Sequence, residues 1–316
     1  MPDEFLTPAE VAEILKLKKN TVYEMIKRGD LNANKLGKQL RISRSDLDAY
    51  LSGQTTSQAT VTNVSTAQPS MHSPLGATPL DAQGESLIVC GQDMILDKLC
   101  DRINENENGI LMLRSHKGSY NGLYALYNRQ VHIATCHLWD PETDNYNLPY
   151  IPKLLPGLPV RVFHILNRKQ GFYVPKGNPK KLVSFEDFTR NDITFANRER
   201  GCGTRILLDN KLNKLGIDRT QIRGYYSERN SHLECATAVA VGQADFAIGN
   251  ERTSLQLPDI DFVPLQTESY DLVIPEDLMQ RSSVQMVLAM LRSQDFQTEV
   301  LALGGYDVTN MGQEIS

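Results

Sequence analysis

The chain has 316 residues, of which 41% are hydrophobic and 22% charged, and its net charge is −5. This is ordinary globular composition, which excludes a fully disordered or fibrous protein, and the length suggests roughly two or three domains. The sequence has no run of about 18 apolar residues, and its acidic start, MPDEF, has no apolar core, so we expect neither a membrane span nor a secretory signal. The five cysteines include no C-x-x-C pair, which indicates reduced thiols in the cytoplasm and not a disulfide framework or a zinc site.

Residues 52–84 separate two parts of the chain. Eleven of these 33 residues are Ser or Thr, only Asp81 is charged, and no apolar period is present. Such a composition buries too little surface to order itself and is typical of a flexible tether. We therefore predict a small domain at 1–51, a flexible linker at 52–84 and a larger domain at 85–316.

The small domain has the pattern helix, turn, helix, wing, helix. Residues 7–10 form a capping box with proline at the first helical position, which predicts a helix from residue 8. Its buried face is expected to carry Val11, Ile14 and Leu15. A second helix is predicted over 20–28, followed by two short strands within 31–42 and a third helix from residue 43.

This small domain closely resembles the excisionase-like, MerR-related winged helix-turn-helix domains over residues 5–51. The matching text is LTPAEVAEIL at 6–15, TVYEMIKRGDL at 21–31 and GKQLRISRSDLDAYL at 37–51. Residues 16–44 hold nine lysines and arginines against two acidic residues. A charge block alone is often only a solvated face, but in this context it favours a DNA-binding surface.

The resemblance implies that the second helix and the wing contact a double-stranded DNA operator. The residues expected to do so are Lys18, Lys19, Asn20, Thr21, Tyr23, Lys27, Lys35, Lys38 and Arg41. Because one such domain is small, we expect two copies on each operator, and therefore a homodimer or a higher even oligomer.

The large domain has an α/β pattern. Apolar strands are predicted at 87–90, 110–113 and 131–135, with helices after the first two. The same alternation restarts after residue 180, with strands at 193–196, 222–226 and 246–248 and helices at 204–214 and 232–241. It predicts two mostly parallel sheets, and hence two lobes with a cleft at the carboxyl ends of the strands, the second lobe spanning about 176–263.

The large domain resembles the type II periplasmic-binding-protein fold over about residues 86–280. More narrowly, it is similar to the substrate-binding-like domains fused to excisionase-type regulators. The resemblance is carried by HLWDPET at 137–143, YNLP at 146–149, NRERGCGTR at 197–205 and SHLECATAVAVGQAD at 231–245. Relatives transport or sense molybdate, tungstate and other small anions. The resemblance therefore implies a cytoplasmic, ligand-responsive transcription regulator with a small anionic effector. The sequence has no P-loop, no G-x-S-x-G and no dinucleotide-binding motif, so we expect neither an enzyme nor a covalent cofactor.

The segment 198–205 indicates an anion site independently of that resemblance. Its glycines, hydroxyl and two guanidiniums stand where a helix is expected to begin, and free amides and the helix dipole favour an anion there. Gly118-Ser119 and Ser231-His232 stand at two further expected helix starts, although a single glycine loop is also typical of an ordinary turn. The residues predicted to bind the ligand are Gln92, Ser119, Thr135, Arg198, Cys202, Gly203, Thr204, Arg205, Ser231 and His232.

Molybdate or tungstate is the favoured ligand, but one departure leaves alternatives open. Relatives that bind these oxyanions usually have Ser or Thr after the first strand, where this chain has Gln92-Asp93. Asp93 would repel a dianion unless it caps the helix or is protonated. An organic anion or a cofactor precursor is therefore the alternative ligand. An enzyme on the same two-lobed fold is a further alternative for the function.

Cysteine and histidine are the residue types that could add redox or metal chemistry. Cys202 is either a sensor thiol, whose pKa a helix N-terminus and nearby arginines would lower, or a small residue in the place of Ser. The six histidines show no metal-binding spacing, so we expect no transition-metal site. His116, His137 and His232 are expected near the cleft, in packing or orienting roles.

Overall fold

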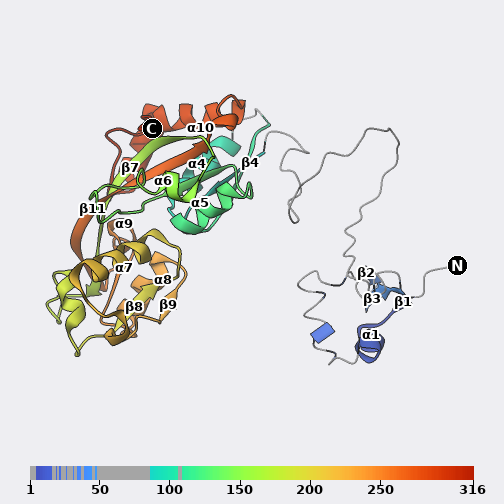
Figure 1. Ribbon diagram of the computed structural model, residues 1–316, viewed down its shortest axis with the longest axis horizontal. Helices are drawn as coiled ribbons and strands as arrows, with labels where there is room; N and C mark the ends of the chain where they lie inside the picture. The colour runs from blue at the N-terminus through green and yellow to red at the C-terminus, as the bar shows by residue number, and fades with distance from the viewer. Residues whose placement is uncertain are drawn as a thin grey trace. The chain divides into compact units, whose positions relative to one another are not determined.

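The computed structural model describes residues 86–105 and 109–316 continuously and parts of the first 47 residues, namely 5–15, 19, 21–22, 26, 31, 34–36, 39–44 and 47. The chain divides into two compact units, Met1–Pro74 and Leu75–Ser316 (Figure 1). The predicted linker at 52–84 lies outside the described residues, so its bounds remain a prediction. Each unit is described by itself below.

The first unit forms the predicted helix start and wing. The Thr7 amide donates to the Glu10 carboxylate at 2.7 Å and the Glu10 amide donates to the Thr7 hydroxyl at 3.3 Å, which begins α1 (Pro8–Leu15). The wing is an antiparallel pair of β2 (Asn34–Leu36) and β3 (Gln39–Ser43), and β1 (Phe5–Leu6) pairs with the other edge of β3. Within the predicted second helix, the described residues 21, 22 and 26 are helical, and the remainder lies outside the described residues.

The core of the first unit includes side chains of β1, α1 and β3. It contains Leu6, Val11, Ala12, Val22, Leu31, Ile42 and Leu47. The prediction was wrong for Ile14, which is 42% exposed. Pro8, Val11 and Ala12 define the inner face of α1, and Ile14 lies to the side of that face.

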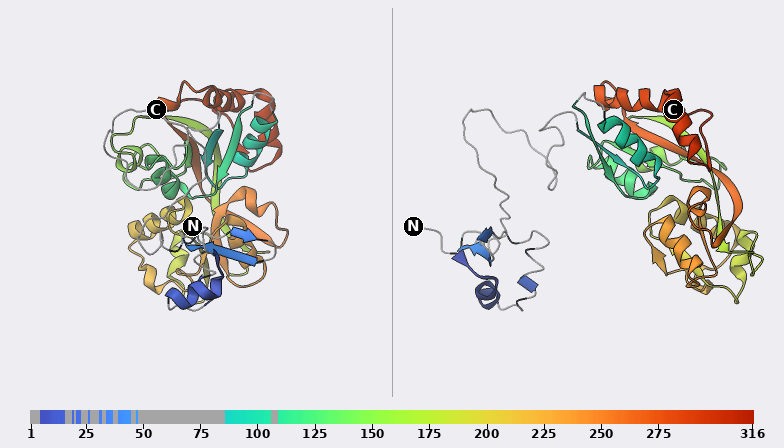
Figure 2. Two further views of the ribbon diagram at one scale, coloured as in Figure 1. Left: turned by 90° about the vertical axis from the view of Figure 1, so that its right-hand side faces the viewer. Right: turned by 180° about the vertical axis from the view of Figure 1, so that it is seen from behind.

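The second unit has two lobes joined by two long strands (Figure 1, Figure 2). Lobe 1 contains most residues from 86 to about 166 and those from about 270 to 316. Lobe 2 contains those from about 170 to 266, and Trp139 and Tyr146 pack into its core. The strands are β4 (Ser86–Cys90), β5 (Leu111–Ser115), β6 (Ile133–Cys136), β7 (Val160–Pro175), β8 (Phe195–Arg198), β9 (Glu228–Arg229), β10 (Phe246–Asn250), β11 (Ile260–Pro275) and β12 (Tyr306–Asp307). The helices are α4 (Ile95–Asn104), α5 (Ser119–Tyr127), α6 (Ile151–Leu154), α7 (Gly203–Leu215), α8 (His232–Ala240), α9 (Glu251–Ser254), α10 (Ser282–Arg292) and α11 (Gln294–Ala302), with 3-10 turns at Phe185–Thr189, Arg219–Gln221 and Glu276–Leu278.

The strands β7 and β11 run through both lobes. They pair antiparallel along their whole length, from Pro175 opposite Ile260 to Val160 opposite Pro275. The apolar residues at one end of each strand pack in lobe 1 and those at the other end pack in lobe 2. Both strands carry a register shift near the crossing, as expected where a strand must bend.

The two-lobed α/β fold is confirmed, with one correction to the predicted sheets. In the described part of this unit the strands form one nine-stranded sheet of order β5-β4-β6-β11-β7-β10-β8-β9, with β12 beside β7, and not two separate sheets. The sheet is also mixed: β4, β5 and β6 are parallel, whereas β6, β11, β7 and β10 are antiparallel in turn. The two lobes are therefore halves of one continuous sheet.

The predicted strand at 222–226 was wrong. This segment is a turn, and the strand β9 begins at Glu228. Ile222 and Tyr225 are both buried in the lobe 2 core, which gave the segment an apolar character. Gly224 between them has a φ of 89°, a left-handed conformation that does not continue a strand.

Candidate ligand-binding site

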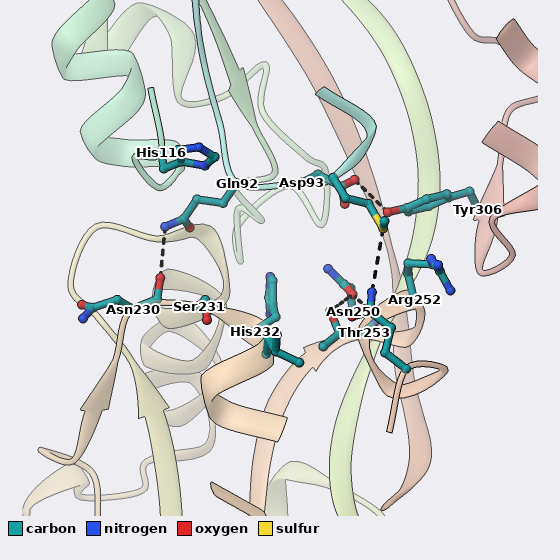
Figure 3. A pocket seen from close by; sticks show the side chains of 13 residues that line it. Gln92, Asp93, His116, Asn230, Ser231, His232, Asn250, Arg252, Thr253 and Tyr306 are labelled. Atoms are coloured by element: carbon teal, nitrogen blue, oxygen red, sulfur yellow. Dashed lines mark hydrogen bonds between the residues drawn. The ribbon is translucent and has the colours of Figure 1, made fainter. Parts of the chain in front are cut away.

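A cavity of about 410 Å³ lies between the two lobes (Figure 3). This volume is in the range of small-molecule sites. Lobe 1 supplies the segment after β4, together with His116 and Tyr306, and lobe 2 supplies the start of α8 and the segment around α9. The lining residues are Gln92, Asp93, Met94, His116, Asn230, Ser231, His232, Leu233, Asn250, Arg252, Thr253, Gln256 and Tyr306.

Local capping places the lobe 2 side of the cavity. The Ser231 side chain accepts from the Glu234 amide at 3.0 Å, so α8 begins at His232 with that side chain at the cavity wall. The Asn250 side chain accepts from the Thr253 amide at 2.9 Å and begins α9, which carries Arg252. Both helix starts directly follow strands, which is where ligands of α/β sheets bind.

Contacts between the lobes border the cavity on two sides. The Gln92 amide donates to the Glu199 carboxylate at 3.0 Å and to the Asn230 carbonyl at 3.4 Å. Elsewhere the Gln256 amide donates to the Met94 sulfur at 3.9 Å. Figure 3 shows the cavity between these two contacts, so a ligand that fills it touches both lobes at once.

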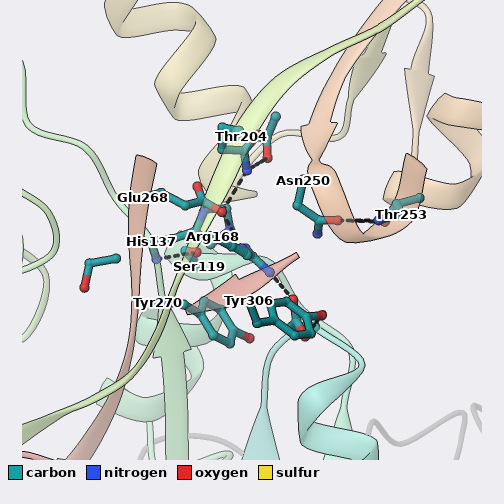
Figure 4. A network of polar contacts seen from close by, with 12 residues as sticks. Ser119, His137, Arg168, Thr204, Asn250, Thr253, Glu268, Tyr270 and Tyr306 are labelled. Carbon is teal, nitrogen blue, oxygen red and sulfur yellow. Dashed lines mark hydrogen bonds and ion pairs between the residues drawn. The ribbon is translucent and has the colours of Figure 1, made fainter. Parts of the chain in front are cut away.

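A buried group of charged residues lies deeper between the lobes, and we call it the Arg168 network (Figure 4). Arg168 on β7 forms ion pairs with Asp93 and with Glu268, its cross-strand partner on β11. Glu268 also lies 2.8 Å from Nδ1 of His137 and accepts from Gln170 at 2.9 Å. The space beside the network is only about 10 Å³, enough for about one water molecule.

The Arg168 network holds the carboxylate of Glu268 ionised. Burial raises the pKa of Glu268, but His137 and Arg168 outweigh it and bring that pKa to about 2. Asp93 accepts from the Ile95 amide at 2.9 Å at the start of α4 and from the Tyr306 hydroxyl at 2.7 Å. Asp93 therefore caps the start of α4. A carboxylate in this capping role repels a nearby anion less than an unpartnered one would.

Two buried polar atoms at the cavity have no hydrogen-bond partner in the part of the chain that is described: Nδ1 of His232 and Nε of Arg252. Burial, together with Arg198, Arg168 and His137, lowers the pKa of His232 well below its usual value, so the imidazole is neutral at pH 7. Native proteins pair the large majority of their buried polar groups. The two at this cavity are therefore available to hydrogen-bond with water or with a ligand.

Five of the ten predicted ligand residues lie at the cavity or beside the Arg168 network. Gln92, Ser231 and His232 line the cavity. Ser119 and Thr135 line the small space beside the Arg168 network, which Gln92 and His232 also border. The structure thus brings residues from the start of α5, the end of β4 and the start of α8 together at one junction.

The predicted segment 198–205 does not line the cavity, although Arg198 donates to the side-chain oxygen of Gln92 at 2.8 Å. Arg198 is 2% exposed and forms an ion pair with Glu199 at 2.8 Å. Arg205 packs under the Tyr225 ring at 4.2 Å and bonds Asp209, at a separate hollow of about 590 Å³. The two guanidiniums predicted to hold the ligand are therefore occupied by carboxylates of the protein itself.

The residues between these arginines join the lobes and do not line the cavity. The Cys202 sulfur accepts from the Arg205 amide at 3.4 Å and caps α7, Gly203 packs on the His137 ring, and the Thr204 hydroxyl accepts from Gln170 at 3.2 Å. Burial raises the pKa of the Cys202 thiol to about 11. This is opposite to the lowered pKa that a sensor thiol requires, so the geometry fits a small capping residue.

Sequence reasoning missed Arg252 and Tyr306. Arg252 stands alone in the sequence, and only the Asn250-x-x-Thr253 cap after a buried strand signals that a helix starts there. Tyr306 lies on β12, a two-residue strand near the end of the chain that pairs with β7 at Arg168. Its place at the cavity follows from that long-range pairing and from no local pattern.

The predicted DNA-binding residues are described only in part. Lys19 and Thr21 are helical and exposed, and Arg41 lies on β3 close enough to Glu10 to lower the pKa of that carboxyl, after the larger effect of the Thr7 hydrogen bonds. Lys35 lies on β2, and its side chain is outside the description. Lys18, Asn20, Tyr23, Lys27 and Lys38 lie outside the described residues.

Membrane and metal features can be assessed for the described ranges only. Within them no helix is both long and apolar enough to cross a bilayer. Nor do three potential metal-ligating side chains come together among the residues that are placed.

Comparison with known proteins matches both parts of the chain. A helix-turn-helix domain family matches residues 5–55, and a PBP superfamily domain matches residues 100–292. The chain is 35% identical to the uncharacterized protein YvgK of Bacillus subtilis (strain 168) over 98% of this chain and 97% of that protein. It is also 43% identical to an uncharacterized Clostridium pasteurianum protein encoded in the 5′ region of a 2Fe-2S ferredoxin gene, over 35% of this chain and 98% of that protein.

Among solved structures, a putative phosphate ABC transporter substrate-binding protein of Clostridium perfringens with bound phosphate is similar in fold. Its TM-score is 0.53 at 13% identity, and the match covers 70% of this chain and 98% of that one. The sequence matches and the two-lobed fold with its interlobe cavity indicate the same family. The chain belongs to the PBP superfamily and carries a helix-turn-helix domain ahead of its PBP superfamily domain.

Proposed function

We propose that this protein is a ligand-responsive, DNA-binding transcription regulator of the cytoplasm that senses a small anion in the interlobe cavity. One observation carries the proposal: a helix-turn-helix domain shares a chain with a two-lobed domain whose cavity holds unpaired polar atoms. The first part supplies contacts to DNA, and the second supplies a site for an effector. A regulator needs both, whereas an enzyme on this fold has no use for the first.

The mechanism rests on the two long strands that join the lobes. A ligand in the cavity touches both lobes and therefore favours the closed arrangement over any open one. Closure changes the surface of the second unit, and in a homodimer or higher even oligomer it changes how two copies meet. The DNA-binding units of the copies then reach their half-sites with a different spacing, which couples ligand binding to DNA binding.

For the effector, the sequence resemblance favours molybdate or tungstate, and the cavity also suits an organic anion. A thermal-shift screen of the full chain against molybdate, tungstate, sulfate, phosphate and small organic acids tests this choice. A ligand at about 100 times its Kd stabilises the protein by about 2.7 kcal/mol, which is easily measured. DNA binding by the full chain, with and without the compounds that shift Tm, then tests regulation.

The DNA-binding part is tested through its salt dependence. Lys19→Ala should lower affinity for DNA and reduce the slope of log K against log salt by about one, because one phosphate contact is lost. Arg129→Ala is the matched control, since Arg129 is an exposed cation of the second unit, paired with Asp277. If both variants reduced the slope equally, the helix-turn-helix domain would not be the DNA-contacting surface.

A further inference from the structure

The arginines around the lobe junction differ in how their charge is matched. Arg168 and Arg198 each form ion pairs with carboxylates and are almost completely buried. Arg252 lines the cavity, and within the described residues no carboxylate forms an ion pair with it and its buried Nε has no partner. It is therefore the cavity-lining guanidinium left to bind an anion from outside the chain.

His232 supplies a second unmatched group on the same lobe. It is 8% exposed, its Nδ1 lacks a partner among the described residues, and its ring points into the cavity (Figure 3). Because burial keeps the imidazole neutral, one ring nitrogen donates a hydrogen bond and the other accepts one. Such a ring suits a hydroxyl, carbonyl or amide group and does not add positive charge to the site.

The charge of the opposite wall limits the ligand to few negative charges. The carboxylate of Asp93 lines the cavity from lobe 1, and although Arg168 pairs with it, it adds no attraction for an anion. His116 also lines the cavity, on an exposed segment of lobe 1. One unpaired guanidinium opposite the Asp93 carboxylate favours a ligand with a single negative charge.

The size and polarity of the cavity favour an organic molecule. A tetrahedral oxyanion would fill only a small part of about 410 Å³. Met94, Leu233 and the ring of Tyr306 provide apolar wall between the polar groups. Apolar walls with a few placed polar groups are typical of sites for organic ligands.

Building on the proposed function, we infer that the cavity binds a small organic monocarboxylate, whose carboxylate pairs with Arg252 and whose second polar group bonds His232. Lobe 2 thus holds the ligand, and the Gln92 and Met94 contacts of lobe 1 close over it. The carboxylate takes the place of the ion-pair partner that Arg252 lacks.

The test compares matched probes on the full chain. Thermal shift and calorimetry would be run at millimolar concentrations with 3-hydroxybutyrate, salicylate and 4-hydroxybenzoate, with the uncharged 4-hydroxybenzamide as charge control and with molybdate, tungstate and phosphate. We expect saturable binding of at least one carboxylate and at least about tenfold weaker binding of the amide. The amide comparison uses the native chain and therefore does not depend on a variant that must fold.

Variants then locate the site. Arg252→Ala should weaken the carboxylate at least about tenfold and Arg252→Lys should restore part of the loss, whereas Arg129→Ala should leave binding unchanged. His232→Ala should weaken 4-hydroxybenzoate more than benzoate, because only the former carries the second polar group. Tungstate or molybdate binding that survives Arg252→Ala, with no carboxylate bound, would overturn the ligand class and leave the proposed regulator intact.

Two further outcomes separate the inference from the proposed function. Absence of any carboxylate-dependent shift overturns the inference, whatever the DNA assay shows. A carboxylate that binds through Arg252 and has no effect on a DNA-binding chain supports the inference, but contradicts the proposed regulation.

Discussion

The Arg168 network and the cavity lie side by side at the lobe junction, yet their polar groups are satisfied in opposite ways. In the network every charge has an opposite charge within the protein, and the remaining space is about 10 Å³. In the cavity, Arg252 and His232 have unpartnered buried nitrogens beside about 410 Å³ of space. Buried charge at this junction therefore stabilises the fold in the Arg168 network, whereas in the cavity it is available to bind a ligand. The presence of an arginine alone does not show which of these roles it has.

The largest effect expected from this comparison is on stability, through Arg168→Met. The variant leaves the carboxylates of Asp93 and Glu268 buried without their cation, which should cost about 3–5 kcal/mol in the free energy of unfolding, measured with urea. Arg129→Met, which breaks an exposed ion pair with Asp277, should cost less than about 1 kcal/mol. Equal losses in the two variants would contradict the view that the network is a structural element.

A loss of stability at low pH is the second expectation, because the pKa of Glu268 is depressed to about 2 from its ordinary value of 4.5. A group with a depressed folded-state pKa contributes stability above its unfolded pKa and loses it as pH falls through the folded pKa. The free energy of unfolding should therefore decline between pH 4.5 and 2 by an amount on the order of a few kcal/mol. Urea unfolding of Glu268→Gln over this range should show a shallower decline; an identical slope would assign the acid sensitivity to other groups.

Contact between the lobes is tested by Gly118→Ala. A methyl group there would lie 2.4 Å from Cα of Cys202 across the junction, while the φ of −68° at Gly118 is ordinary for alanine. The added methyl should push the lobes apart and cost about 1–3 kcal/mol, in line with overpacking elsewhere. Small-angle X-ray scattering should detect a larger radius of gyration, and an unchanged radius with unchanged ligand affinity would mean that this contact does not control closure.

Tyr306 belongs to both regions. Its hydroxyl donates to Asp93 in the network while its ring lines the cavity. Tyr306→Phe removes one hydrogen bond to a charged group, so we expect a loss of about 1.5–3 kcal/mol by urea unfolding. The loss should disappear in an Asp93→Ala background, which removes the acceptor oxygens, if the two side chains act as a pair, and persist there if Tyr306 acts through packing alone.

Local signals in the sequence predicted the elements well. The Thr7–Glu10 capping box and the Ser231 cap begin helices where expected, because a cap is a contact between residues close in sequence. The joining strands were missed for the opposite reason. Residues 167–170 of β7, Asn-Arg-Lys-Gln, interrupt the apolar pattern, and their partners on β11 stand about 100 residues away.

The candidate site was predictable to a lesser degree. Gln92, Ser231 and His232 line the cavity as predicted. Each follows a strand or begins a helix, and this local signal was sufficient to predict it. An arginine can bind a ligand only if no carboxylate of the protein lies beside it in the fold. The sequence reveals such a carboxylate only when it is adjacent in the chain, as Glu199 is to Arg198. The lack of a carboxylate beside Arg252 is a property of the folded chain that no sequence pattern expresses.

The pairing of β7 with β11 also describes how lobe 2 is attached. The chain leaves lobe 1 at Gln170 and returns at Gln266, and these two residues face each other as neighbours in the ladder. The segment 170–266 is therefore a single uninterrupted insert whose ends emerge side by side, as the ends of a hairpin loop do, and Trp139 is the buried core residue that lobe 2 takes from outside it. Such an insert can be exchanged for that of a relative, or shortened to a tight turn, without changing the path of the chain through the lobe 1 sheet. Effector preference can therefore change in evolution separately from the structure of lobe 1.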